Sequence, residues 1–271
     1  MVNRRILPGY RLSLTFTLFY LGVIVMVPLA ACLITAGSLS WSQFVAAVWT
    51  PRARAAYYLT IGAALVSSII STIIGLLIAW VLVRYEFPGK RFFDSLVDLP
   101  FALPTAVAGL VFANLYVPNG WLGRFLVPLG IEGAYSRFAI VLVLVFLGFP
   151  FVVRTVQPVL ESLDQESEEA AACLGANRWQ AFRRVLFPAL YPALITGFAL
   201  SVARALGEYG SVIFVSGNMP FKTEIAPVLI VAKLEEFQYA EATAIAVVLL
   251  ALSFAMLITI NWLERWSKTD G

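Results

Sequence analysis

The sequence predicts an all-α integral membrane protein with six transmembrane helices, and three observations support this class. Apolar residues make up 61% of the 271 residues and charged residues only 13%, about half the share found in an average soluble domain. The mean hydropathy is +0.86. The apolar residues also form six separate runs that meet or approach the roughly 20 residues needed to cross a bilayer core. Lipid is therefore the expected solvent for most of the chain.

The six predicted spans are residues 12–35, 57–83, 99–117, 138–155, 190–215 and 242–263. The third opens with Pro100 and Pro104. A proline near the start of a helix lacks only an N–H group that would be unpaired anyway, although a kink at Pro104 is the alternative. The fourth span is short, and we expect Arg154 to extend it by reaching toward the lipid headgroups. The fifth span contains two charged residues.

The distribution of Lys and Arg predicts the orientation, because cytoplasmic loops carry an excess of positive charge. With the N-terminus in the cytoplasm, the cytoplasmic segments hold twelve of these residues and the outer loops six. The cytoplasmic set is Arg4, Arg5, Arg11, Arg84, Lys90, Arg91, Arg154, Arg178, Arg183, Arg184, Arg265 and Lys268, and the outer set is Arg52, Arg54, Arg124, Arg137, Lys222 and Lys233. Both termini are therefore predicted to be cytoplasmic.

The predicted organisation is one compact bundle. Residues 1–11 form a cytoplasmic N-terminus, 12–35 the first transmembrane helix and 55–265 the transmembrane core, since no Pro/Gly/Ser linker divides the chain. A basic pair before the first run and the sequence LAAC ending at Cys32 also resemble a cleaved signal. The first run is long enough to span and five more follow, which favours a retained anchor.

The residue inventory argues against an enzyme. The sequence has no His, and its two cysteines, Cys32 and Cys173, lie far apart, so neither a metal site nor a disulfide is expected. It has no phosphate-binding Gly-x-x-x-x-Gly-Lys-Ser/Thr loop, so this chain is not expected to hydrolyse ATP or to bind a cofactor. An acidic group at Glu208 could carry a proton in a secondary transporter, but beside Arg204 it is expected to stay ionised.

The segment 160–188, predicted to be cytoplasmic, contains the sequence EEAAACLGANRW. Its acidic and Ala-rich first part predicts a helix, and Gly175 follows where a left-handed C-terminal cap is needed. Asn177 can then cap a second helix that ends near Pro188. Such a stiff elbow could dock into a groove on a partner protein. It could equally be an amphipathic connector on the lipid headgroups.

Two charges in the fifth span, Arg204 and Glu208, are four residues apart and therefore share one helix face. Because a lone charge is costly in the bilayer, we expect them to form an ion pair that faces the bundle interior, a water-filled path or a partner. The pair is either a structural clamp or part of a gate. Glycines on both sides of Tyr209 loosen the helix, and Ser211 supplies a hydroxyl there, so both join the candidate gate residues.

Four acidic residues lie in the outer segment before the last span. We expect them mainly to keep this loop solvated, with contact to a partner as the alternative. These residues are Glu224, Glu235, Glu236 and Glu241.

The elbow resembles the EAA–Gly–Leu-Pro loop of binding-protein-dependent ABC importer permeases. The residues that carry this resemblance are Glu169, Ala170, Ala171, Gly175 and Pro188. The resemblance implies that these residues couple the permease to an ATPase. Phe187 stands where the family more often has Leu. The resemblance favours docking of the elbow into a cleft of a cytoplasmic ATPase subunit.

Three further stretches, LPFALPTAVAG (99–109), FVVRTVQP (151–158) and ALGEYGSV (205–212), are similar to the T-type permeases of bacterial sulfate/thiosulfate importers. That resemblance covers almost the whole chain and implies a multi-pass subunit of the bacterial inner membrane. It also implies a pore shared with a W-type permease, a dimeric cytoplasmic ATPase that uses ATP and Mg²⁺, a periplasmic sulfate-binding protein and no nucleic acid. A molybdate or related oxyanion permease is the alternative.

Overall fold

A computed structural model describes residues 9–163 and 165–269, with side chains described for residues 9–163 and 167–262. All regular elements in these ranges are helices, which confirms the all-α class. The α-helices are α1 (Tyr10–Leu21), α2 (Val27–Ala36), α3 (Trp41–Val48), α4 (Pro51–Arg84), α5 (Lys90–Val97), α6 (Leu99–Ala102), α7 (Thr105–Tyr116), α8 (Gly123–Leu126), α9 (Arg137–Ser162), α10 (Gln165–Cys173), α11 (Arg178–Ala181), α12 (Phe187–Leu206), α13 (Val212–Val215), α14 (Ala226–Glu235) and α15 (Tyr239–Thr269). The predicted cytoplasmic N-terminus, residues 1–11, lies mostly outside the described ranges.

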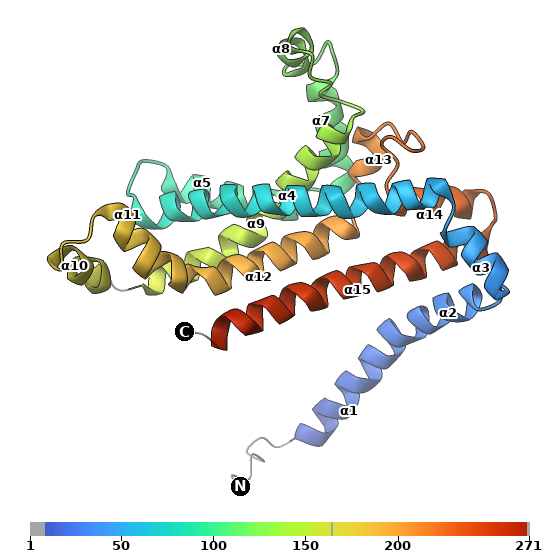
Figure 1. The fold of residues 1–271 in the computed structure, drawn as a ribbon, viewed down its shortest axis with the longest axis horizontal. Coiled ribbons are helices and arrows are strands. Elements are labelled where there is room, and N and C mark those ends of the chain that lie inside the picture. The colour runs from blue at the N-terminus through green and yellow to red at the C-terminus, as the bar shows by residue number, and fades with distance from the viewer. Residues whose placement is uncertain (1–8, 164, 270–271) are drawn as a thin grey trace.

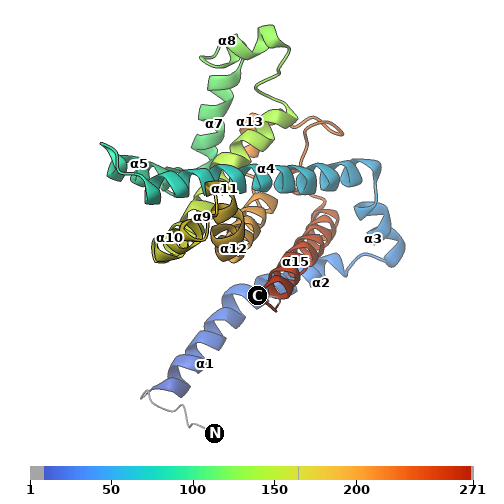
Figure 2. The same ribbon diagram turned by 60° about the vertical axis from the view of Figure 1, so that its left-hand side comes forward.

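Within the described ranges, five helical segments are long and apolar enough to cross a membrane. They are Tyr10–Ala36, Pro51–Arg84, Arg137–Ser162, Arg178–Leu206 and Tyr239–Trp262. The four later ones, built on α4, α9, α12 and α15, form the bundle (Figure 1), whereas α1 points away from it in both views (Figures 1 and 2). Accordingly, the most apolar window of the first segment has no buried residue.

The predicted third span, residues 99–117, is interrupted rather than continuous. Leu103 is extended, with ψ 130°, because the proline that follows it disfavours helical backbone. The helix resumes as α7, whose 12 residues give a length of about 18 Å at 1.5 Å per residue, less than a bilayer core of about 30 Å. Pro104 therefore separates two short helices instead of kinking a long one.

The bounds of the fourth and fifth spans also differ from the prediction. Helix α9 continues past the predicted end at residue 155 to Ser162, with two prolines inside it. Helix α12 ends at Leu206 and α13 follows only at Val212, so residues 207–211 form a loop within the predicted fifth span, 190–215. Gly207, which favours leaving a helix, marks this end.

The helix expected to stop near Pro188 instead continues through it. A π turn, Phe182–Leu186, joins α11 to α12, and the N–H of Phe187 donates to the carbonyl of Phe182. Proline cannot continue the ordinary i→i−4 ladder, and the wider turn accommodates it. The same arrangement joins α1 to α2, where a π turn, Gly22–Met26, precedes Pro28.

Small residues let α4, α9 and α12 approach closely. A Cβ added at Gly148 would lie 2.3 Å from the Oγ of Ser201, and one at Gly75 would lie 2.6 Å from the Cβ of Val152. Membrane helices associate through such close packing because lipid gives no hydrophobic drive between them. These contacts form the rigid centre of the bundle.

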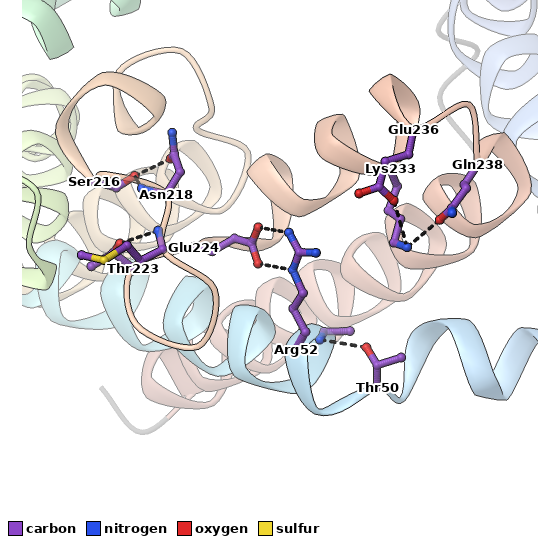
Figure 3. Close-up of polar contacts among 11 residues, drawn as sticks. Thr50, Arg52, Ser216, Asn218, Thr223, Glu224, Lys233, Glu236 and Gln238 are labelled. Atoms are coloured by element: carbon purple, nitrogen blue, oxygen red, sulfur yellow. Dashed lines mark hydrogen bonds and ion pairs between the residues drawn. The ribbon is translucent and has the colours of Figure 1, made fainter.

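The first turn of α4 is held by the buried side chain of Glu224, which was expected to be solvated. Arg52 donates from Nε to Oε2 at 2.8 Å and from Nη2 to Oε1 at 2.7 Å (Figure 3). Of the other acidic residues in this segment, Glu236 and Glu241 lie 3.3 and 3.2 Å from the Nζ of Lys233. The expectation of a merely solvated loop is therefore wrong for Glu224.

Candidate functional site

The elbow predicted within residues 160–188 is a tight turn between α10 and α11. Gly175 has φ +82°, and the N–H groups of Gly175 and Ala176 donate to the carbonyls of Ala172 and Ala171 at 2.9 and 3.0 Å. Glycine adopts this left-handed cap without a Cβ penalty. Asn177 then caps α11, accepting from the N–H of Gln180 at 2.8 Å. The Gly175 and Asn177 predictions are both confirmed.

An ion pair ties this elbow to the bundle. The Nη2 of Arg84, at the end of α4, lies 2.5 Å from the Oε1 of Glu168 on α10. The same guanidinium lies over the ring of Trp80, which meets the ring of Phe182 edge-on with centroids 5.7 Å apart. The sequence analysis did not predict this role for Glu168, although the adjacent acids Glu168 and Glu169 could have indicated an ion pair. A movement of α10 therefore acts directly on α4.

Four of the five predicted coupling residues lie on α10 or in the turn after it, and the fifth, Pro188, lies on α12. Glu169, Ala170 and Gly175 are exposed and Ala171 is half-buried. Pro188 is also exposed but belongs to α12, beyond the π turn. Next to the turn, Leu174 and Trp179 are 89% and 67% exposed. The turn therefore presents two large apolar side chains to its surroundings.

The loop 207–211 brings the four candidate gate residues together. Arg204 forms an ion pair with Glu208, as predicted. Glu208 is only 2% exposed, and its Oε1 also accepts from the N–H and the Oγ of Ser211, both at 2.8 Å. Tyr209 packs against the adjacent core. The buried carboxylate of Glu208 therefore has hydrogen-bond partners on both sides, and these bonds hold the loop against the end of α12.

Helix α7 presses on this loop, which the sequence reading missed. A Cβ added at Gly109 would lie 2.3 Å from the carbonyl oxygen of Ser211, and one at Gly210 would lie 2.3 Å from the Oγ1 of Thr105. Two backbones approach this closely only where glycine replaces larger residues. The small residues of PTAVAG were the available signal. The candidate gate thus has a second wall from the interrupted third span.

Arg154 on α9 forms a branched set of charged contacts with α5 and the residue that follows it. It donates to both carboxylate oxygens of Asp98 at 2.8 and 2.7 Å, to the Oδ1 of Asp94 at 2.7 Å and to the main-chain oxygen of Asp94 at 2.9 Å. It also donates to Gln157 at 2.7 Å. The expected headgroup-reaching role is wrong because α9 continues for two more turns. The guanidinium instead ties α9 to α5.

The elbow and the gate lie at opposite ends of α12, whose 20 residues span about 30 Å. Among the described residues, no group of three or more His, Cys, Asp or Glu side chains could hold a metal ion. An exposed turn therefore lies at one end of α12 and a closed polar loop at the other.

Comparison with known proteins gives the family. The profile described as "Binding-protein-dependent transport system inner membrane component" matches residues 71–269. The sulfate transport system permease protein CysT of Salmonella typhimurium is 50% identical over 262 residues, covering 97% of this chain and 95% of the relative. Its counterpart from Escherichia coli K12 is 48% identical with the same coverage.

A solved structure shares the fold. A chain of the bacterial ABC transporter that imports the acidic polysaccharide alginate superposes with a TM-score of 0.76 at 14% identity, covering 95% of this chain and 96% of that one. At this identity the likeness shows the fold alone. Together with the family profile and the two sulfate permeases, it confirms the resemblance seen in the sequence. The chain is a non-enzymatic membrane permease subunit of the ABC importer type and belongs to the family of binding-protein-dependent transport system inner membrane components.

Proposed function

We propose that this chain is the T-type permease subunit of an ATP-driven importer of sulfate and thiosulfate in the bacterial inner membrane. The observation that carries this proposal is the 50% identity to a sulfate permease over 97% of the chain. Both termini lie in the cytoplasm, so α10 and α11 face the cytoplasm and residues 207–238 face outward. The last turn of α12, with Arg204, and the loop that follows it, with Glu208, Tyr209 and Ser211, form part of the translocation gate.

The proposal includes three protein partners. A W-type permease completes the pore, a periplasmic sulfate-binding protein delivers the anion, and a dimeric ATPase that uses ATP and Mg²⁺ receives the elbow. The exposed apolar helices of the chain support the first partner. Phe16 on α1 is 67% exposed and Val111 on α7 is 48% exposed, so lipid and a second subunit would cover them. This chain itself holds no cofactor.

Uptake of labelled sulfate tests the substrate. Cells lacking this chain are compared with cells in which it is restored, with thiosulfate and molybdate as competitors. We expect loss and rescue of sulfate uptake, with thiosulfate competing better than molybdate. Sulfate uptake that is indifferent to the chain, with molybdate uptake dependent on it, would replace sulfate by molybdate in the proposal.

Replacing the exposed apolar side chain beside the turn tests the elbow. We expect Leu174→Ser to lower recovery of the ATPase subunit with tagged permease at least tenfold, because a docking surface loses its apolar anchor. Phe92 on α5 is also exposed, at 64%, and Phe92→Ser is the matched control that retains the ATPase. Equal recovery with both variants would exclude Leu174 from the docking surface.

A further inference from the structure

We propose that Arg154 is a positioning residue that transmits movement of the cytoplasmic elbow to the gate through the interrupted third span. The inference rests on the proposed docking of the elbow to an ATPase subunit and does not depend on which anion is transported. Its starting point is the guanidinium of Arg154, which joins three acceptor side chains on two helices. A planar fork held by two carboxylates fixes direction as well as distance.

The cytoplasmic end of the path is short. Arg154 lies on α9 two turns before its end at Ser162, and α10 begins at Gln165. The elbow therefore cannot shift far without moving the last turns of α9. Because Glu168 on α10 also pairs with Arg84, α4 and α9 are displaced together. Arg154 links α9, which is displaced with α4, to α5 through its ion pair with Asp94.

The other end of the path leads into the third span. Asp98 is the single residue between α5 and α6, so the carboxylate held by Arg154 sits at the joint of the two helices. Helix α6 is further held by Phe101, whose ring meets that of Phe151 on α9 edge-on at 4.9 Å. A shift of α9 therefore carries Asp98 and Phe101 with it and changes the position at which α6 and then α7 begin.

Helix α7 delivers this shift to the gate. Its residues Thr105 and Gly109 lie against Gly210 and Ser211 with no room for a Cβ. Ser211 in turn donates twice to Glu208. Packed interiors of this density transmit displacement instead of absorbing it. The contacts form a contiguous chain from elbow to gate, along which a displacement of packed groups can pass.

The charges sit where a switchable contact is possible. The side chains of Arg154, Asp94 and Asp98 are 31%, 38% and 52% exposed, so water reaches the network. A partly hydrated ion pair can break and reform at modest cost, whereas a fully buried pair cannot. The network can therefore adopt two arrangements as the importer alternates between its states.

The test measures coupling in proteoliposomes that hold the complete importer and its binding protein. Arg154→Gln, Arg154→Lys and wild type are compared at equal amounts of assembled complex. We expect Arg154→Gln to keep basal ATP hydrolysis within twofold of wild type and to lose at least 90% of anion transport per ATP. Arg154→Lys, which keeps the charge but not the fork, should retain an intermediate ratio. A purely structural residue would lower the yield of assembled complex and leave the ratio of transport to ATP hydrolysis unchanged.

The matched control is the exposed pair of Lys90 and Glu86, whose Nζ and Oε1 lie 2.7 Å apart on the same side of the membrane. Lys90→Gln should leave the ratio of transport to ATP hydrolysis unchanged. The doubly swapped variant Arg154→Asp with Asp98→Arg should regain part of the coupling lost by Arg154→Asp alone.

Two outcomes would overturn the inference: an unchanged ratio in Arg154→Gln, or parallel loss of transport and hydrolysis at equal assembly. Both are read on whichever anion wild type transports. If wild type carries molybdate and not sulfate, the proposed substrate fails while the test of Arg154 still stands.

Discussion

Neutralising Glu208 is expected to abolish transport and to destabilise the protein. In Glu208→Gln the buried side chain, 2% exposed, loses its charge while Arg204 keeps its own. Removing one partner of a fully buried ion pair costs about 3–5 kcal/mol, and the loss here should be smaller because the Arg204 side chain left behind is 33% exposed. The loop also loses a charged acceptor for Ser211. The measurements are thermal unfolding of purified permease in detergent and anion uptake in cells.

A double variant separates the clamp from the gate. Arg204→Met with Glu208→Gln removes both charges, and replacing an ion pair by uncharged groups is often close to neutral for stability. We expect the double variant to regain most of the lost stability but not the transport. Recovery of both would make the pair a structural clamp alone, and recovery of neither would show that the pair is not the source of the loss.

The second large effect is expected at Gly109. In Gly109→Ala the new methyl group would lie 2.3 Å from the carbonyl oxygen of Ser211, a separation that real Cβ atoms essentially never show. Since the obstacle is backbone, α7 must move away from loop 207–211, at a cost of about 2–3 kcal/mol for overpacking. Uptake should fall at least tenfold because the second wall of the gate is displaced. Thermal unfolding and uptake are again the measurements.

Gly62→Ala is the matched control for this substitution. Gly62 also lies in a membrane helix, α4, but apart from the nearby backbone of that helix no atom lies within 4 Å of the position of its Cβ. Because alanine favours helix by up to about 1 kcal/mol over glycine, this variant should be as stable as wild type or slightly more so. Equal stability of the two variants would show that α7 and the loop do not form the tight contact described.

Local sequence patterns predicted the parts of the site that depend on local chemistry. Gly175 as a left-handed cap and Asn177 as a helix cap each depend on groups within a few residues. The pairing of Arg204 with Glu208 depends on one helical turn. The five long spans could also be predicted, because they follow from hydropathy and length alone. These features could be predicted because propensity and tertiary packing favour the same conformation.

The features that the sequence did not predict depend on contacts between distant segments. Arg154 and Asp98 are 56 residues apart, and Arg52 and Glu224 are 172 residues apart, so no local spacing connects them. The interrupted third span needed the effect of Pro104 on Leu103 to be weighed against an apolar run that favours one helix. The path of the chain through Pro188 depended on a π turn, which proline alone does not specify.

The π turn before Pro188 also sets the rotational phase of the helix that follows. A π turn holds about one residue more than an α-helical turn, and one residue corresponds to about 100° around the axis. The face that α12 presents to α4 and α9 is therefore offset by roughly that angle from the face presented by α11. One extra residue thus allows the elbow to point outward to a partner while the next helix keeps its small residues inward. The rotation of the elbow relative to the membrane helix is consequently set by the five residues of the π turn. Neither the surface of the elbow nor that of the helix has to change.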